Sequence, residues 1–244
     1  MWKQPNNVRP NEDRFTRILI ISPHCDDAVF SCGDLLAVHP GAVVVTVFAG
    51  RPPSGGKLTE WDEASGFQQG DDVMGLRREE DRAALSGLHA EPVWLDFCDS
   101  QYKQSPTAAE LTDALERVCR HADPDAVFFP LGLFHDDHKL AHAASLSLRE
   151  RAATSRWFAY EDAIYRRYRG LVQERLSGLA IAGIVLTPIA PAACRDSPHK
   201  RQAMDCYVSQ LRALCTPGRP GYQDAFAPET YWRIEVEGNE GRPG

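Results

Sequence analysis

Two short runs of histidine and aspartate contain the residue types that bind a catalytic metal ion. The first run is Pro-His-Cys-Asp-Asp, with His24, Asp26 and Asp27, and the second is His-Asp-Asp-His at 135–138. Catalytic zinc sites commonly use three protein ligands, favour imidazole and carboxylate groups, and leave one position for water. His24, Asp27 and His138 supply such a set. We therefore predict one metal site that is shared by the two runs.

The other side chains of the two runs suit the remaining steps of acyl transfer. Zinc lowers the pKa of a bound water to roughly 7, and a neighbouring carboxylate can then accept its proton. Asp26 is adjacent in sequence to the ligand Asp27, so we expect it to be this general base. We expect His135 to stabilise the oxyanion of the tetrahedral intermediate, and Asp137 to orient an imidazole.

Each run also has a structural explanation that needs no metal. Asp26 and Asp27 could cap a helix, and His135 and His138 could lie at a solvated helix start. The presence of two such runs, each after an apolar strand, favours the metal site. His142 has the helical spacing of an extra ligand, although a surface or supporting role is more common for such a residue. We expect structural roles for the four isolated histidines, which are His39, His89, His121 and His199.

The elements that must position the two runs are strands of a parallel sheet. Apolar stretches at 17–21 and 126–131 directly precede them, and continuous apolar stretches are typical of strands covered on both faces. Alternation with helical segments predicts an α/β fold with a Rossmann-like, doubly wound, mostly parallel sheet and helices on both faces. In the commonest strand order the first and fourth strands are neighbours. That order would place His24 beside His135, although about 110 residues separate them.

Further elements follow from the same patterns. We expect a flexible lead-in at 1–16, a single α/β domain at 17–236 and a disordered tail at 237–244. The segment 51–70 is rich in Gly, Pro and Ser and contains two aromatic residues, so it is either a lid over the substrate or a mobile insertion. We expect strands at 42–48, 92–97, 155–160 and 181–188, an edge strand at 231–236, and helices at 28–39, 71–87, 106–121, 139–152 and 197–215.

Composition narrows the class of protein. The net charge of -7 argues against non-specific binding to nucleic acid or to an anionic membrane. No apolar run reaches the roughly 18 residues that a membrane helix needs, and the polar start lacks a signal-peptide core, so we expect a cytoplasmic enzyme. The seven cysteines contain no C-x-x-C pair and predict reduced thiols. Cys25 has the chemistry of a nucleophile or ligand, but nothing marks a partner for it.

The two runs resemble the motifs of the PIG-L/LmbE family of zinc-dependent N-deacetylases, which act mostly on N-acetylglucosamine-type substrates. The family motif Pro-His-x-Asp-Asp is matched at 23–27, and His-x-Asp-His at 135–138. Cys25 and Asp136 stand where the family usually has proline. The resemblance implies that His24, Asp27 and His138 bind one Zn²⁺, that Asp26 is the general base, and that His135 stabilises the oxyanion or acts as the acid.

The resemblance also implies two substrate contacts outside the runs. Arg77 begins an Arg-x-x-Glu pattern on an expected helix, and Asp99 follows the third expected strand. The form of the first motif is similar to that of family members that deacetylate sugars on antibiotics or other secondary metabolites. The partner implied is therefore a small N-acetylated sugar or glycoconjugate.

The function expected is hydrolytic removal of an N-acetyl group from an aminosugar-containing small molecule. Two alternatives stay open at this point. A metal-dependent hydratase or lyase that acts on a small carboxylate can use the same fold, and a cationic pocket rather than an aromatic sugar platform would favour it. A catalytically silent binding protein would bind ligand without metal. Histidine and carboxylate ligands also suit iron and other divalent ions. The substrate and the oligomeric state are left open.

Overall fold

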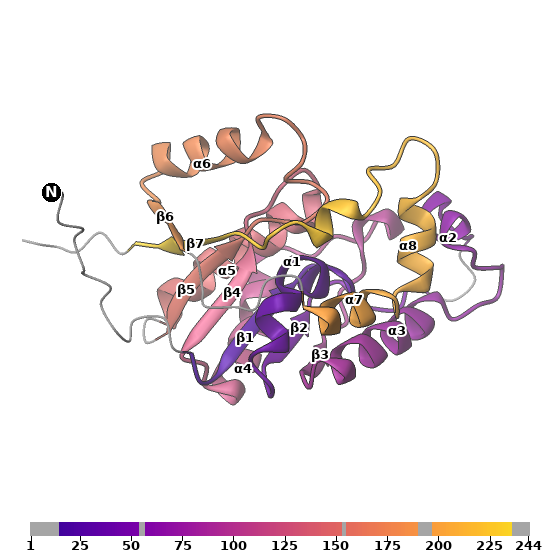
Figure 1. Cartoon of the computed structure of the whole chain (residues 1–244), viewed down its shortest axis with the longest axis horizontal. Coiled ribbons are helices and arrows are strands. Elements are labelled where there is room, and N and C mark those ends of the chain that lie inside the picture. Colours follow the sequence, from indigo (N-terminus) through magenta and orange to yellow (C-terminus); the bar gives the residue numbers. More distant parts are fainter. Residues whose placement is uncertain (1–14, 54–56, 153–154, 190–196, 236–244) are drawn as a thin grey trace, which may run out of the picture.

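The computed structural model describes residues 15–53, 57–152, 155–189 and 197–235. Within them, seven strands form one mixed sheet in the order β3-β2-β1-β4-β5-β7-β6 (Figure 1). The strands from β3 to β5 in this order run parallel, whereas β7 is antiparallel to both β5 and β6. The predicted doubly wound, mostly parallel α/β sheet is confirmed.

The elements alternate along the chain as the apolar pattern predicts. The strands are β1 (Ile18–Ser22), β2 (Val43–Thr46), β3 (Glu91–Trp94), β4 (Ala126–Pro130), β5 (Arg156–Tyr160), β6 (Leu186–Ile189) and β7 (Tyr231–Ile234). The helices are α1 (Asp27–Ala37), α2 (Glu60–Ser65), α3 (Val73–Gly87), α4 (Ala108–Ala122), α5 (Asp136–Arg151), α6 (Leu171–Ile181), α7 (Pro198–Met204) and α8 (Val208–Leu214), with 3₁₀ turns η1 (Ser100–Tyr102) and η2 (Gln223–Phe226).

The two central strands, β1 and β4, are direct neighbours. Their register pairs Ile18 with Ala126 and Ile20 with Phe128. Since parallel strands end at the same edge of a sheet, the turns that follow β1 and β4 diverge from one point, where open α/β sheets bind their ligands. The expected strand order therefore brings the two histidine-aspartate runs together.

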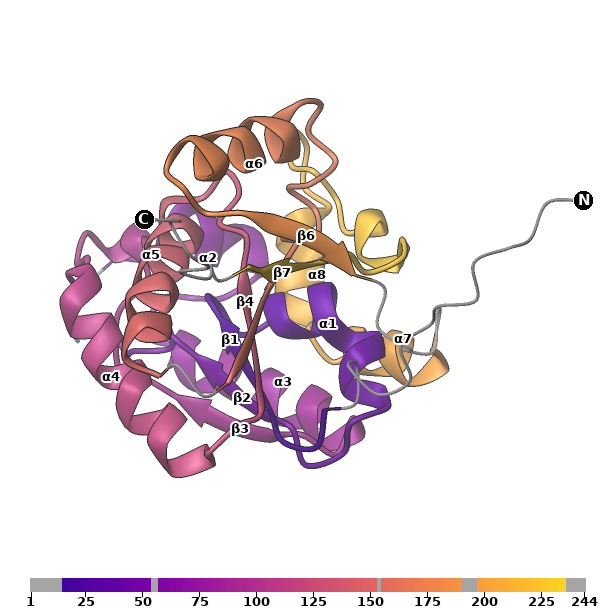
Figure 2. The ribbon, with the colours of Figure 1, turned by 90° about the vertical axis from the view of Figure 1, so that its left-hand side faces the viewer.

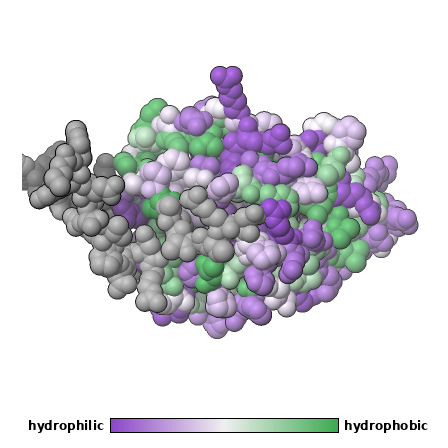
Figure 3. Space-filling model, in the orientation of Figure 1, coloured by the Kyte–Doolittle hydropathy of each residue, from purple (hydrophilic) through white to green (hydrophobic). Residues whose placement is uncertain are grey.

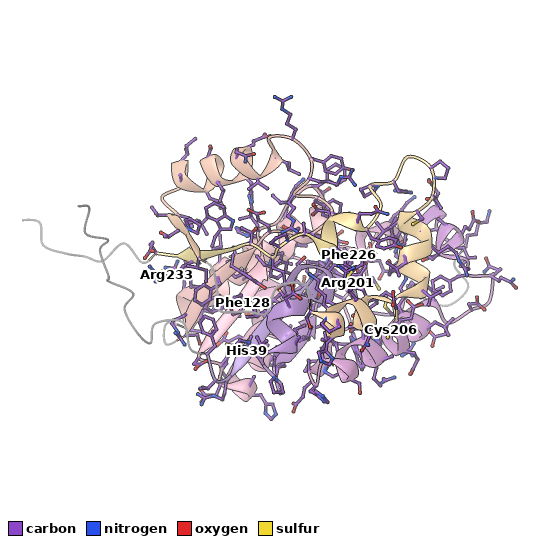
Figure 4. The ribbon with its side chains drawn as sticks, in the orientation of Figure 1. His39, Phe128, Arg201, Cys206, Phe226 and Arg233 are labelled. Carbon is purple, nitrogen blue, oxygen red and sulfur yellow. The ribbon has the colours of Figure 1, made fainter. Side chains whose placement is uncertain are left out.

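Helices cover both faces of the sheet, because successive strand side chains point to opposite faces. Ile18 and Ile20 belong to a core with side chains of α1, α3 and α7, and Leu19 and Ile21 to a core with α4 and α5. Figure 2 shows α4 and α5 on one side of the sheet, with α1, α3 and α7 on the other. Phe128, labelled in Figure 4, lies at the centre of the first core.

Helix α1, which begins at the first histidine-aspartate run, is kinked. Cys32 leaves helical geometry with φ -136° and ψ 17°, which frees backbone N–H groups in the middle of the helix. The carboxylate of Glu229 accepts hydrogen bonds from the N–H of Asp34 at 2.7 Å and of Leu35 at 3.1 Å. It also forms a buried ion pair with Lys200 at 2.8 Å. Glu229 thereby stabilises the kink, so that the first turns of α1 run in a different direction from its later turns.

The expected continuous helix at 197–215 is wrong, since the structure contains two shorter helices, α7 and α8. Cys206, labelled in Figure 4, lies at the break between them. The side chain of Tyr207 turns inward there, and its hydroxyl donates to Asp81 at 2.7 Å. Glu80 of α3 then accepts hydrogen bonds from the backbone N–H and the hydroxyl of Ser209 at 2.8 and 2.6 Å. Tertiary partners, rather than local sequence, interrupt the helix.

Two expected strands near the C-terminus are also wrong in detail. Ile181, placed in a strand at 181–188, instead ends α6, and Gly183 follows with a left-handed φ of 80° that suits a helix end. The strand begins only at Leu186. The expected edge strand at 231–236 is β7, which lies between β5 and β6, so β6 is the edge.

The described part of the segment 51–70 contains helix α2, which packs against α8. Thr59 and Asp62 form a reciprocal capping box at its start. Residues 54–56 lie outside the described residues. Most of the expected lead-in and the whole of the expected tail also lie outside them, whereas Phe15 is buried against the sheet and Thr16 donates its N–H to Asp125 at 3.0 Å.

The surface hydropathy and the helices of the described residues bear on whether the chain could cross a membrane. The face seen in Figure 3 is a mosaic of hydrophilic and hydrophobic residues. None of the described helices is both long and apolar enough to span a bilayer.

A buried carboxyl group, Asp81 of α3, joins several elements behind the site. It accepts hydrogen bonds from the Trp94 indole N–H at 2.7 Å and the Tyr207 hydroxyl at 2.7 Å. Burial outweighs these hydrogen bonds and raises the pKa of Asp81 from 3.8 to about 7.

This pKa predicts a pH-dependent stability. The folded chain retains a proton that the unfolded chain releases, so the contribution of Asp81 is fully present below pH 3.8 and is lost as the pH rises through about 7. One pKa unit corresponds to about 1.4 kcal/mol, so the loss is a few kcal/mol. We expect Asp81→Asn, which keeps an acceptor, to flatten the fall in the free energy of unfolding across this range. Urea unfolding of metal-free protein measures it, and equal slopes in both proteins would contradict it.

Candidate metal centre

The first histidine-aspartate run is fixed by local hydrogen bonds between β1 and α1. Ser22, the last residue of β1, donates its hydroxyl to the carbonyl of His24 at 2.6 Å and accepts the N–H of Ala28 at 3.0 Å. The backbone N–H of His24 donates to Asp27 Oδ2 at 2.9 Å. The turn therefore holds the imidazole and the carboxylate on the same side.

The second run begins α5, and His135 is the N-cap of that helix. Its Nδ1 accepts the backbone N–H of Asp137 at 3.2 Å. The tautomer that accepts at Nδ1 carries its proton on Nε2. Burial, together with the nearby His24 and His138, lowers the pKa of His135, so this imidazole is neutral.

The structure brings the predicted ligand set together. His24 Nδ1 lies 3.1 Å from Asp27 Oδ2, and His138 Nε2 lies 3.2 Å from the same oxygen. The ring centroids of His24 and His138 are 5.3 Å apart. One ligand atom from each of the three residues lies within 4.8 Å of the others, a spacing that a single metal ion can bridge. His24 Nε2, His135 and Asp137 form a second group of the same kind.

The buried imidazole of His138 supports a cation at this point. Its Nδ1–H donates to Asp162 Oδ1 at 2.5 Å, which leaves the lone pair of Nε2 facing Asp27. That Nε2 has no hydrogen-bond partner among the described residues, and the residue is only 1% exposed. Two acceptors that face each other in a buried place repel unless a proton or a metal ion lies between them. The donor set fits a divalent metal.

Asp162 is a site residue that the sequence reasoning missed. It follows β5, and its second oxygen accepts the backbone N–H groups of Gly132 at 2.9 Å and Leu133 at 3.1 Å. A carboxylate that holds a ligand histidine is a common feature of metal sites. The available signal was its position, because Asp162 lies just after β5 (Arg156–Tyr160), the strand next to β4.

The pKa values of His138 and Asp27 also reflect the opposite charges of these two side chains. Burial by itself lowers the pKa of His138, but the negative charge of Asp27 and the hydrogen bond to Asp162 outweigh burial and raise it to about 9. Burial likewise raises the pKa of Asp27, but the positive His138 and His24 outweigh it and leave this pKa far below the usual range. Protons on the histidines thus neutralise the negative charge of Asp27, which a bound metal ion would neutralise in their place.

Asp137 and Asp99 approach the other nitrogen of His24. Asp137 Oδ2 lies 3.1 Å from His24 Nε2, and it also accepts the N–H and hydroxyl of Ser100 at 3.1 Å each. Asp99 Oδ2 is farther from that nitrogen, at 3.8 Å. Asp99 caps η1 by accepting the backbone N–H of Gln101 at 3.0 Å.

Asp26 lies at the start of α1 but does not cap the helix with its side chain. It lines the cavity beside the metal-binding residues. Burial first, and then the negative charge of Asp27, raise its pKa to about 7. A carboxyl with this pKa accepts protons near neutral pH, as a general base must.

Arg77 lines the cavity, but its guanidinium is already paired. Its Nη2 donates to Asp62 Oδ1 at 2.9 Å, and both side chains are buried. Its Nε–H has no hydrogen-bond partner among the described residues. Arg77 therefore anchors α2 to α3 in the wall of the cavity, and its unpaired Nε–H is buried.

The cavity has a volume of about 440 Å³, within the range of about 300–1,000 Å³ that holds a drug-sized ligand. Carboxylates and imidazoles lie at one end, and aromatic side chains line much of the remainder. The aromatic side chains in its wall are Phe48, Trp61, Phe134, Tyr165 and Tyr168.

Other residues considered from the sequence lie outside the ligand groups. His142 is buried, and its Nδ1–H donates to the carbonyl of Pro130 at 2.9 Å. Cys25 lines the cavity, but burial raises the pKa of its thiol well above the ordinary value, so it is protonated and a poor nucleophile. The cysteines in the described part of the chain are free thiols, as expected, and Cys194 lies outside that part.

The hydrogen bond between Asp162 and His138 gives a prediction on metal affinity. We expect Asp162→Asn to weaken zinc binding about 10- to 100-fold, because the carboxylate raises the basicity of the imidazole and fixes its orientation. Competition with a chromophoric chelator measures the affinity. Asp136→Asn is the matched control, since that carboxylate is in the same run but is exposed. Equal zinc affinity in wild type and Asp162→Asn would contradict the role.

The proton on His138 gives a second prediction. Metal binding must displace this proton, whose pKa is about 9, so the apparent zinc affinity should rise as the pH increases from 6 to 9. Calorimetry in buffers with different ionisation enthalpies should also detect protons released on binding. An affinity that is constant over this range would show that the ion binds elsewhere.

The chain is 29% identical over 165 residues to 2'-N-acetylparomamine deacetylase from Streptomyces fradiae, a match that covers 58% of this chain and 55% of that relative. The chain thus spans about half the length of this curated relative.

Two solved structures share the fold over nearly the whole chain. The A40926 pseudoaglycone deacetylase Dbv21 is 27% identical, with a TM-score of 0.74 over 90% of this chain and 97% of that one. A triple mutant of a deacetylase involved in teicoplanin biosynthesis is 28% identical, with a TM-score of 0.76 over 92% and 100%. The sequence profile of the GlcNAc-PI de-N-acetylases matches residues 19–148, more than half of the chain and both histidine-aspartate runs. The chain belongs to the PIG-L family.

Proposed function

We propose that the protein is a metal-dependent hydrolase that removes an N-acetyl group from an aminosugar-containing small molecule. The observation that carries this proposal is the convergence of His24, Asp27 and His138 on one point, with Asp26 beside them in a cavity. The named relatives deacetylate 2'-N-acetylparomamine and the A40926 pseudoaglycone, or belong to teicoplanin biosynthesis. An antibiotic-type aminosugar conjugate is therefore the substrate class we propose.

His24, Asp27 and His138 would hold the metal ion, which we propose to be Zn²⁺. When bound, the ion supplies an acidified water and polarises the acyl oxygen. Asp162 keeps the Nδ1 proton of His138 in place, so that Nε2 is the nitrogen presented to the metal. Asp137 orients His24 from its other side.

Asp26 is the proposed general base. Its carboxyl lies in the cavity and makes no capping bond with α1, so its oxygens are free to accept a proton from water. Its pKa of about 7 lets it exchange that proton near neutral pH and return it to the leaving amine.

His135 is the proposed donor to the oxyanion. The helix N-cap bond occupies its Nδ1, and the ring lines the cavity with a proton on Nε2. A donor fixed before the reaction stabilises negative charge without reorganisation. Asp99 and Arg77, which line the cavity, are proposed to contact the sugar.

The cavity favours this reaction over hydration of a small carboxylate. Of its lining residues, Arg77 is paired with Asp62 at 2.9 Å and Arg219 with Glu60 at 3.1 Å. Neither guanidinium is free to neutralise a carboxylate substrate, whereas aromatic rings line the wall. A silent binding protein is the weaker explanation too, because each step of hydrolysis has a residue in place.

Substitution of the base tests the proposal. We expect Asp26→Ala and Asp26→Asn to retain zinc and to lower kcat about 100- to 10,000-fold, the range typical of a general base. In the wild type, kcat/KM should rise as the pH increases through about 7, and the residual activity of the variants should lack this dependence. Acetate release from a panel of N-acetylated sugars, with and without chelator, measures the activity.

Asp136→Asn serves as the control for a lost negative charge, because that carboxylate is exposed. Robust deacetylation by Asp26→Ala would remove Asp26 from the mechanism. Full activity after complete removal of divalent metal would overturn the metal-dependent reaction itself.

A further inference from the structure

Three aromatic rings stack on one another in the cavity wall, and no chemical step of the proposed reaction is assigned to them. The Phe134 ring stacks on Tyr165, with ring centroids 5.3 Å apart and an angle of 24°, and on Tyr168, at 5.3 Å and 23°. All three side chains line the cavity. Phe134 is nevertheless 55% exposed and Tyr168 is 40% exposed. We call these three residues the aromatic platform.

The aromatic platform starts at the metal-binding residues and leads outward. The Tyr165 ring meets the His138 imidazole edge-on at 5.1 Å. Phe134 is the next ring and Tyr168 the one after it. A group that rests on Phe134 and Tyr168 is thus two to three ring steps from the reacting centre.

The backbone holds the platform in place at an energetic cost. Phe134 and Ile164, which also lines the cavity, both have left-handed backbone angles, with φ of 59° and 66°. Such angles are costly for these side chains and persist only where the surroundings enforce them. Asp162 accepts the N–H of Leu133 at 3.1 Å, and Asp224 accepts that of Ile164 at 3.1 Å. Strain of this kind gathers at ligand sites.

Leu214 and Pro220 also line the cavity, together with the polar residues Glu60, Gln210 and Arg219. Arg167 donates a hydrogen bond to the carbonyl of Pro220. That bond ties the loop of Pro220 to the loop that carries Tyr168. The carboxylates that line the cavity near the metal-binding residues are Asp26, Asp27 and Asp99.

We propose that the aromatic platform binds an aromatic ring attached to the aminosugar of the substrate, so that the enzyme prefers aryl aminosugar conjugates. This inference rests on the proposed deacetylation and names the group on the far side of the sugar. Offset stacking of aromatic rings contributes about 0.5–1.5 kcal/mol beyond the burial of their area. The phenyl ring of Phe134 is exposed and already held in position, so stacking a ligand ring on it costs little side-chain conformational entropy.

The test compares two substrates that differ only beyond the sugar. We expect kcat/KM for 4-nitrophenyl N-acetyl-β-D-glucosaminide to exceed that for the methyl glycoside about tenfold. Phe134→Ala and Tyr168→Ala should each reduce this ratio toward unity. Phe134 directly precedes His135, so an effect of Phe134→Ala can also arise from a shift of that imidazole. Tyr168→Ala controls for such a shift, because Tyr168 is not adjacent to His135 in sequence. Ile181→Ala is the control, since that side chain is 88% exposed and does not line the cavity.

Several outcomes would overturn the inference and leave the deacetylase intact. A ratio near unity in the wild type is one, and a ratio that both variants retain is another, since the platform would then bind the sugar itself. A third is a preference for the N-hexanoyl over the N-acetyl methyl glycoside that Phe134→Ala abolishes, because the platform would then hold the acyl chain.

Failure to deacetylate any substrate in the panel would instead count against the proposed function. Binding of the two amine products, 4-nitrophenyl and methyl β-D-glucosaminide, then decides the inference separately. Calorimetry should show about tenfold tighter binding of the aryl product to wild type and a smaller difference in the two variants. Equal binding of both products to the wild type would exclude an aryl site.

Discussion

The buried imidazole of His138, held between two carboxylates, is the interaction on which the candidate site depends. Asp162 accepts its Nδ1–H at 2.5 Å, and Asp27 faces its Nε2 at 3.2 Å. In a buried place, a lone pair and a carboxylate oxygen at this distance repel each other unless a positive charge lies between them. The bond to Asp162 decides which nitrogen meets that charge. The arrangement fits a cation, and its histidine and carboxylate groups suit a divalent metal.

The sheet supplies these groups from three adjacent strands. Asp27 follows β1, His138 follows β4 and Asp162 follows β5, and these strands are consecutive neighbours in the parallel part of the sheet. Their carboxyl ends meet at one edge, so groups far apart in sequence converge without long side chains. The crevice at the switch point of the fold and the proposed reaction site are therefore the same place.

The surroundings of the site carry several local penalties that the rest of the fold offsets. Phe134 and Ile164 have strained backbone angles, and buried nitrogen atoms of Arg77 and His138 lack hydrogen-bond partners among the described residues. Natural proteins tolerate such violations mainly at functional sites. Buried ion pairs such as Asp62 with Arg77 hold the walls of the cavity, so that the site keeps its shape while its own groups remain unsatisfied.

The sequence by itself determined the local parts of this protein. The buried strands before each histidine-aspartate run, the turn at His24 and the helix that begins near His135 follow from apolar periodicity and polar residues within a few positions. The α/β class followed from their alternation, and the choice of ligands from residue types. The neighbouring positions of β1 and β4 came from the commonest strand order, which periodicity does not reveal.

Only the tertiary structure decided the contacts between distant segments. Periodicity at 197–215 indicated one helix, but Asp81 draws the Tyr207 side chain inward and breaks it. Only the tertiary structure decided three further contacts. They are the ion pair of Arg77 with Asp62, the stacking of Phe134 on two tyrosines, and the hydrogen bond from His138 to Asp162. The physical reason is that each depends on the approach of side chains across the fold, and single-sequence patterns report only what neighbours along the chain prefer.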